Sequence, residues 1–180
     1  TKASYCLTSE IFQSLLPDNC KPIITDKVLL HTAHITKIFY PDSITDNYDG
    51  TVKDINETKF KDKVKFGKNV LIGENVKIGA NCLIGHNSII EKNVQILDGC
   101  VIGKKGFGFF PNKENNCRYP QIGIVIIDDN VEIGCGSKID KGSLSNTIIG
   151  KNTYLDNQIH IAHNVKIGEN CIIAGQVGFA

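Results

Sequence analysis

Apolar residues recur at every sixth position along most of this chain. A second small or β-branched apolar residue often follows four positions later, as at Val76, Cys82 and Val94. The anchors of the pattern are Phe60, Phe66, Ile72, Ile78, Ile84, Ile90, Ile96, Ile102, then Ile127, Ile133, Ile139, then Ile149, Leu155, Ile161, Ile167, Ile173 and Phe179. A fixed six-residue period is typical of a parallel β-helix, in which each hexad forms one short strand and one corner.

The hexads also predict how the coils are built. Three hexads would close one triangular coil, and successive coils would stack their strands about 4.8 Å apart. The anchors should point inward. Gly after the anchor and Asn at the fourth place, as in Ile72-Gly73 and at Asn75, are expected to adopt the positive φ of sharp corners. We therefore predict an all-β fold class, a left-handed parallel β-helix preceded by the remnant of a small α/β domain.

The first forty residues do not follow the six-residue period. Extended and helical signals alternate there, with strands expected at 5–8 and 22–24 and helices at 10–15 and 28–39. Ser9 and Asp26 stand where helix N-caps are expected. This alternation is typical of a small α/β domain.

The chain is accordingly divided into three parts. We expect the α/β remnant at 1–41, a linker at 42–58 and the β-helix at 59–180. The linker contains Asp-Gly and Asn turn signals. The β-helix is expected to be incomplete at its C-terminal end, because solenoids need capped ends and Ala180 directly follows the anchor Phe179.

Composition excludes several classes of function. The net charge is +1 and Arg118 is the one arginine, which argues against a nucleic-acid surface. No apolar run approaches the roughly 20 residues of a membrane span, so no integral membrane segment is expected. The seven cysteines form no CxxC pair, and Cys82, Cys100 and Cys171 take inward positions. Reduced core thiols in a cytoplasmic protein are expected.

Two insertions interrupt the hexads. Residues 104–123 leave the period and contain Phe107 and Phe109 between glycines, and 142–146 form a shorter bulge. Extra residues must project from the coil, because inside it they would shift the inward positions out of phase. Exposed aromatics on such a loop favour a functional or interface role.

The densest chemistry lies at 156–165. Asp156 and Asn157 replace a corner Gly, and His163 occupies another corner, where a side chain faces outward. A neutral imidazole can act as a general base, and a carboxylate seven residues earlier could orient it. Spacing alone leaves open that these are ordinary exposed polar residues.

Two motifs carry a family resemblance. The segments DNQ-x-x-IAHNV and GFGF…PQIG, together with KPIITDKVLLHTAHITKIFYP near the start, resemble the UDP-3-O-acylglucosamine N-acyltransferases of bacterial lipid A synthesis. The resemblance covers nearly the whole chain and implies that 1–41 is the end of a uridine-binding domain. It implies a cytoplasmic bacterial homotrimer with active sites between neighbouring solenoids.

The same resemblance implies the roles of individual residues. His163 would be the catalytic base that deprotonates the 2-amino group of the UDP-sugar, and Asp156 would support it. Substrate binding would involve Asn157, Gln158, Phe107, Phe109 and Gln121. The acyl donor would be a 3-hydroxyacyl chain on the phosphopantetheine of acyl carrier protein, with no further cofactor and no metal. A backbone N–H at a Gly corner, with Gly175 as a candidate, would bind the oxyanion.

Three alternatives remain open at this stage. A γ-type carbonic anhydrase uses the same scaffold with three zinc-binding histidines, but His160 and His163 are closer than its local pair and His86 is the only other solenoid histidine. Another hexapeptide-repeat sugar-nucleotide acyltransferase is the second alternative. The third is an inactive, truncated solenoid used for assembly. Lys105 before the GFGF loop and 25–29 near the start depart from the family pattern.

Overall fold

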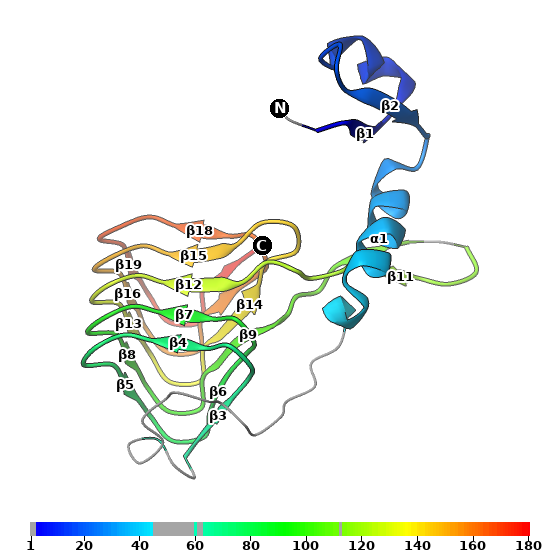
Figure 1. The fold of residues 1–180 in the computed structure, drawn as a ribbon. Helices are drawn as coiled ribbons and strands as arrows, with labels where there is room; N and C mark the ends of the chain where they lie inside the picture. Colours follow the sequence, from blue (N-terminus) through cyan, green and yellow to red (C-terminus); the bar gives the residue numbers. More distant parts are fainter. Residues whose placement is uncertain (1–2, 45–59, 61–62, 112) are drawn as a thin grey trace. The chain divides into compact units, whose positions relative to one another are not determined.

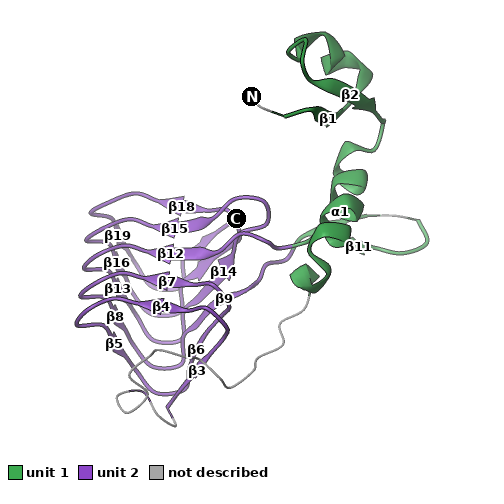
Figure 2. Cartoon of the chain, viewed as in Figure 1, with its two compact units in different colours: residues 1–44, 108–120 green, residues 45–107, 121–180 purple. Residues whose placement is uncertain are grey.

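The structure is a computed structural model that describes residues 3–44, 60, 63–111 and 113–180 (Figure 1). It contains two compact units, residues 1–44 with 108–120 and residues 45–107 with 121–180 (Figure 2). Most of the linker predicted at 42–58 lies outside the described residues.

The N-terminal part of the first unit matches the predicted elements closely. Strands β1 (Tyr5–Thr8) and β2 (Lys21–Ile24) pair in parallel, and the segment between them forms a 3₁₀ helix, η1 (Glu10–Leu15). Helix α1 (Val28–Phe39) follows, and a short 3₁₀ helix, η2 (Pro41–Ile44), comes after it. None of the described helices is long and apolar enough to cross a membrane.

Of the two predicted N-caps, the position of Ser9 is confirmed and that of Asp26 is wrong. Ser9 is the N-cap of η1, although its side chain makes no capping hydrogen bond. At α1 the N-cap is Lys27 rather than Asp26, again without a side-chain bond. The Thr25 hydroxyl accepts a hydrogen bond from the Lys27 N–H at 3.0 Å, so a turn before the helix takes the place of the cap.

The larger insertion also contributes to the first unit. Strands β10 (Phe109–Phe110) and β11 (Cys117–Arg118) form an antiparallel pair. The guanidinium of Arg118 lies 4.5 Å from the centre of the Phe109 ring, a cation–π contact. The ammonium of Lys37 in α1 lies 3.6 Å from the Cys117 thiol, which ties the pair to the helix.

The second unit is a stack of coils whose strands form three parallel sheets. The first sheet contains β3 (Val64–Phe66), β6 (Cys82–Ile84), β9 (Val101–Lys105), β14 (Lys138–Lys141), β17 (His160–Ile161) and β20 (Gly178–Phe179). The second contains β4 (Leu71–Ile72), β7 (Ile89–Ile90), β12 (Val125–Ile127), β15 (Thr147–Ile149) and β18 (Lys166–Ile167). The third contains β5 (Lys77–Ile78), β8 (Gln95–Ile96), β13 (Glu132–Ile133), β16 (Tyr154–Leu155) and β19 (Ile172–Ile173).

The register between coils confirms three hexads per coil. Leu71 pairs with Ile89, and the Asn69–Asn87 side-chain contact spans the same 18 residues. Across the two insertions the spacing grows to 37 and 22 residues, yet strands still pair in parallel. Both insertions therefore leave the coil without disturbing its phase. This confirms the predicted fold class, an all-β fold in which hexapeptide repeats form a parallel β-helix.

The anchors fill the interior as predicted. Ile84, Ile90 and Ile102 are almost completely buried in one core cluster together with Val76, Cys82 and Val94. All seven cysteines are free thiols. The hydrogen bond with the Cys82 thiol and burial raise the pKa of the Cys100 thiol, so Cys100 stays protonated inside the core.

The corners correct one prediction. Asn at the fourth place of the hexad does have positive φ, for example +58° at Asn75 and +56° at Asn170. Among the described glycines that follow an anchor, Gly103 alone has positive φ, at +79°. At Gly73 and most of the others, Gly is required because the next coil comes too close. A Cβ at Gly73 would lie 2.6 Å from the backbone nitrogen of Lys92. Asn and Gly are therefore needed at one corner for different reasons: Asn adopts the positive φ of the turn, and Gly leaves room for the backbone of the next coil.

We predict that Ile84→Asp unfolds the β-helix. Ile84 is fully buried, and an uncompensated carboxylate there should cost about 4 kcal/mol or more. Circular dichroism during urea unfolding measures the loss. Lys77→Asp, at an exposed outward position of β5, is the matched control and should change little. A stable, soluble Ile84→Asp protein would contradict the inward assignment.

A second prediction tests whether close approach of the next coil is the reason for Gly at position 73. Gly73→Ala should lower stability by about 1–3 kcal/mol, because the new methyl group meets the backbone of the neighbouring coil. Gly178→Ala should change it by less than about 0.5 kcal/mol, since no heavy atom lies within 4 Å of the new Cβ. Equal urea midpoints for the two variants would refute the steric explanation.

Candidate active site

Every interruption of the hexads falls at one corner of the β-helix. This corner joins the first sheet to the second, and we call it the His163 corner. The insertion 104–123 leaves between β9 and β12, and 142–146 leaves between β14 and β15. His163 lies at the same corner one coil later, between β17 and β18. The sequence features that seemed separate are thus stacked on one edge of the solenoid.

His163 is half-buried at this edge and touches the base of the larger insertion. A Cβ at Gly106 would lie 2.7 Å from Cδ2 and 2.8 Å from Cβ of His163. Only glycine lets the chain pass so close to the imidazole. Gly106, the first glycine of the GFGF segment, therefore helps to position His163, a role that the sequence did not predict.

Asn164 holds the other side of the imidazole. Its Nδ2 lies 2.9 Å from Nδ1 of His163. Its Oδ1 accepts a hydrogen bond from the backbone N–H of Ser143 at 2.8 Å, and the Ser145 hydroxyl lies 3.1 Å from the same oxygen. The second insertion therefore supports His163 through Asn164. No described residue makes a hydrogen bond to Nε2 of His163.

Asp156 does not meet His163 within the chain. It lies at the corner between the third and first sheets, and β17 separates the two, a span of more than ~10 Å for an extended segment of this length. Its carboxylate accepts hydrogen bonds from the N–H of Asn157 at 2.7 Å and from the N–H of Gly175 at 3.0 Å. Gly175, the candidate oxyanion donor, is therefore engaged by Asp156 at this second corner.

Asn157 and Gln158 also support this second corner. Asn157 Oδ1 accepts a hydrogen bond from the backbone N–H of Cys135 at 2.7 Å. Gln158 has φ of +59° and its side chain bonds to that of Gln176 at 3.0 Å. Both residues link successive coils, which is a structural use of the positions predicted to bind substrate.

The three other predicted substrate residues differ in exposure. Phe107 is 83% exposed and follows Gly106 directly, so it remains near the base of the insertion. Phe109 is 38% exposed and stacks with Arg118 in the first unit. Gln121 is only 1% exposed. Of the three, Phe107 presents the largest apolar surface to a ligand.

The described residues include a histidine–carboxylate pair that the sequence did not single out. Nε2 of His160 lies 3.5 Å from Oδ2 of Asp140 on the outer face of the first sheet. The two residues are 20 apart in the chain, so only the pairing of β14 with β17 brings them together. Among the described residues, no group of three or more His, Cys, Asp or Glu side chains could hold a metal ion.

Comparisons with known proteins match the repeats. The model of the bacterial transferase hexapeptide (six repeats) family matches residues 57–92 and 146–180, and the second segment includes Asp156 and His163. A UDP-3-O-acylglucosamine N-acyltransferase from Bradyrhizobium diazoefficiens is 51% identical over 89 residues, which are 49% of this chain and 25% of the relative. One from Fusobacterium nucleatum is 52% identical over 86 residues, 48% of this chain and 26% of the relative.

These matches confirm the resemblance predicted from the sequence motifs over about half of this chain. The matched part spans about a quarter of the length of these curated relatives. Among solved structures, a UDP-N-acetylglucosamine acyltransferase from Campylobacter jejuni is 18% identical, with a TM-score of 0.40 over 66% of this chain and 58% of that chain. So slight a likeness adds nothing to the argument.

Proposed function

We propose that this chain carries the solenoid part of an N-acyltransferase that transfers a 3-hydroxyacyl chain to the 2-amino group of UDP-3-O-acylglucosamine. The observation that carries the proposal is the position of His163. Its Nε2 has no partner among the described residues, and the ring is held between Gly106 and Asn164. The identity of about 50% to curated enzymes of this name supports the choice of reaction.

In the proposed reaction the amine nitrogen attacks the thioester carbonyl carbon of the acyl chain on acyl carrier protein. A C–N bond forms and the C–S bond breaks, which gives an amide and a free phosphopantetheine thiol. His163 takes the proton from the attacking amine and returns it to the leaving sulfur. No other cofactor is needed for this chemistry. We expect it to take place in the bacterial cytoplasm.

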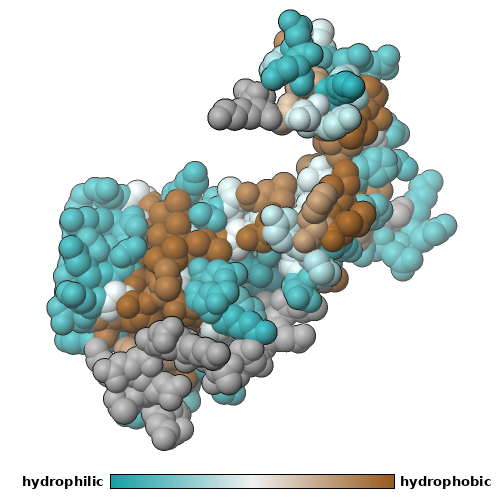
Figure 3. Space-filling model, viewed as in Figure 1, coloured by the Kyte–Doolittle hydropathy of each residue, from teal (hydrophilic) through white to brown (hydrophobic). Residues whose placement is uncertain are grey.

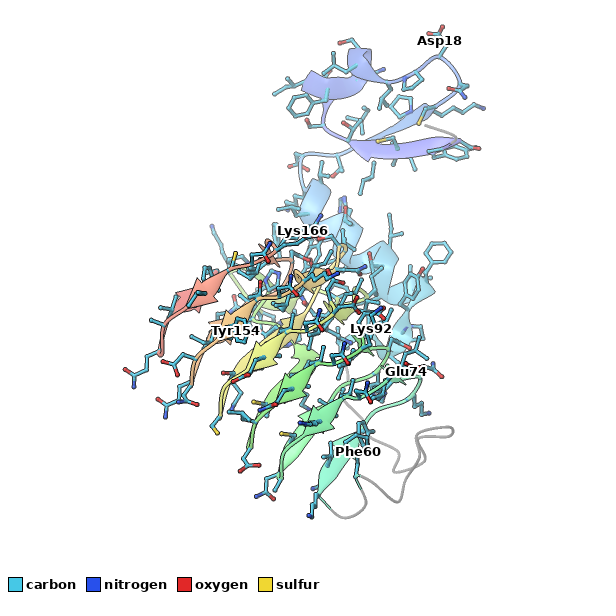
Figure 4. All side chains as sticks on the ribbon, turned by 90° about the vertical axis from the view of Figure 1, so that its left-hand side faces the viewer. Asp18, Phe60, Glu74, Lys92, Tyr154 and Lys166 are labelled. Atoms are coloured by element: carbon cyan, nitrogen blue, oxygen red, sulfur yellow. The ribbon has the colours of Figure 1, made fainter. Side chains whose placement is uncertain are left out.

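An apolar outer face supports assembly into a homotrimer. Leu71, Ile89, Ile126 and Ile148 are aligned in register on the outward side of the second sheet. Figure 3 shows the resulting hydrophobic band across these strands. The outward positions of the third sheet are polar in its first three strands, at Lys77, Gln95 and Glu132, and apolar in the last two, at Tyr154 and Ile172; Figure 4 labels Tyr154. A continuous apolar row on a single sheet is typical of a protein interface.

The apolar face begins at the His163 corner, since the second sheet follows directly after it. A copy packed on this face would bring its own surface next to His163. We therefore propose that Asp156 supports His163 from a neighbouring copy, because it cannot reach His163 within its own chain. Phe107 would then contribute to the groove for the acyl chain, with Asn157 and Gln158 at the neighbouring corner.

Ile126→Lys should disrupt the trimer. A charged ammonium in the middle of the apolar row would be desolvated on association, at a cost that weakens the interface. Sedimentation velocity of the full-length protein at micromolar concentration should change from trimer to monomer. Gln95→Lys is the control. Gln95 points outward from β8 in the third sheet, away from the apolar row, so this variant should remain trimeric. A monomeric unmodified protein would rule out the shared site.

His163→Ala should lower the rate of amide formation in the full-length enzyme by about 10²–10⁴-fold. Binding of the UDP-sugar should change little, because the imidazole acts on a proton that leaves only during attack. The assay follows transfer from 3-hydroxyacyl acyl carrier protein to the sugar nucleotide. Asp156→Asn should have a milder effect, since that carboxylate would only orient the ring.

His160→Ala is the matched control for this assay. Loss of the His160–Asp140 pair should leave the rate nearly unchanged. If His163→Ala kept the full rate and His160→Ala lost it, the general base would be His160 of the His160–Asp140 pair and not His163. No transfer by the full-length protein with this sugar, but transfer to another sugar nucleotide, would favour the broader acyltransferase class.

A further inference from the structure

The amide of Asn164 can be oriented without ambiguity. Its Oδ1 faces the backbone N–H of Ser143 at 2.8 Å, and a backbone N–H can only donate. The Ser143 side chain adds two contacts, with Oγ 3.2 Å from Oδ1 and 2.9 Å from Nδ2 of Asn164. Rotating the amide by half a turn would place its NH₂ against the Ser143 N–H. Ser143 is 93% buried, so that N–H would lose its only acceptor at a cost.

This orientation decides which nitrogen of His163 carries the proton. The Asn164 Nδ2 that lies 2.9 Å from Nδ1 is a donor and has no lone pair to offer. Nδ1 must therefore be the acceptor, and it is unprotonated. A neutral imidazole carries one N–H, so the proton sits on Nε2.

The bulge at 142–146 is what creates this arrangement. Elsewhere at this corner, an Asn of the repeat bonds to the Asn one coil away, as Asn69 does to Asn87. Asn146, the residue 18 positions before Asn164, instead accepts a hydrogen bond from the backbone N–H of Ile124. The bulge therefore offers Ser143 and Ser145 to Asn164, whose Nδ2 also faces His163.

We infer that Asn164, fixed by the Ser143 backbone, is a positioning residue that holds His163 in the Nε2–H tautomer when no substrate is bound. In this state the ring can donate at Nε2 but cannot accept a proton there. General-base catalysis at Nε2 then requires the Asn164–His163 contact to open as substrate enters. This catalytic consequence rests on the proposed function, whereas the tautomer itself does not.

Nitrogen-15 NMR of histidine-labelled protein tests the inference. At about pH 8, above the ordinary pKa of histidine, long-range proton–nitrogen correlations distinguish protonated from unprotonated ring nitrogens. The His163 signals are those that His163→Gln removes. We expect an unprotonated Nδ1 and a protonated Nε2. A protonated Nδ1, or an equal mixture of the two tautomers, would overturn the inference.

Asn164→Asp supplies the reverse arrangement. A carboxylate oxygen beside Nδ1 can only accept, so the proton should move from Nε2 to Nδ1 and the two nitrogen signatures should exchange. Asn170→Asp is the matched control, because Asn170 takes the same place in the next hexad with φ of +56° against +67° for Asn164. It should leave the His163 spectrum unchanged. Retention of Nε2–H in Asn164→Asp would refute the role of Asn164.

The unmodified protein's spectrum decides the question even if Asn164→Asp does not fold. The two proposals also fail separately. An Nε2–H spectrum together with a full rate in His163→Ala would keep the tautomer and reject His163 as the base. A Nδ1–H spectrum with a large loss of rate in His163→Ala would keep the base and reject the restraint by Asn164.

Discussion

The hydrogen-bonded register between coils is the constraint on which the rest of the structure depends. Where no insertion intervenes, each strand pairs with the strand 18 residues away, and backbone N–H groups donate to carbonyl groups of the next coil, as Gly73 does to Ile90. Because these strands are only two to five residues long, no single pairing is strong. The stack is stable because the pairings repeat and bury one continuous core.

This constraint explains both the composition of the corners and the position of the insertions. Strands about 4.8 Å apart leave no room for a Cβ at Gly73, while Asn75 supplies the positive φ of the turn. Extra residues can leave only where the chain already turns outward. Both insertions do so at the His163 corner, so the solenoid stacks loop, bulge and histidine on one edge.

The chemistry at that edge is built from contacts between coils rather than from neighbours in sequence. Gly106 and Asn164 flank the imidazole of His163, and Ser143 orients Asn164. Asp156, which is closer in the chain than Ser143, is used to bind Gly175 at a different corner. Distance along a β-helix is thus a poor guide to distance in space, since residues 18 or 22 apart are neighbours and residues seven apart occupy separate corners.

The sequence by itself determined the period, the number of hexads per coil, the inward anchors such as Ile84 and the phase-preserving insertions. It could do so because each hexad repeats the same local environment, and six-residue repetition is directly visible. The resemblance to N-acyltransferases and the choice of His163 also came from contiguous motifs. Only the tertiary structure decided that Gly73 serves close approach rather than positive φ, that Gln121 is buried, and that Asn164 is oriented by Ser143. Those facts depend on which atoms of the next coil lie opposite, and that is set by the stacking of strands and not by the order of residues along the chain.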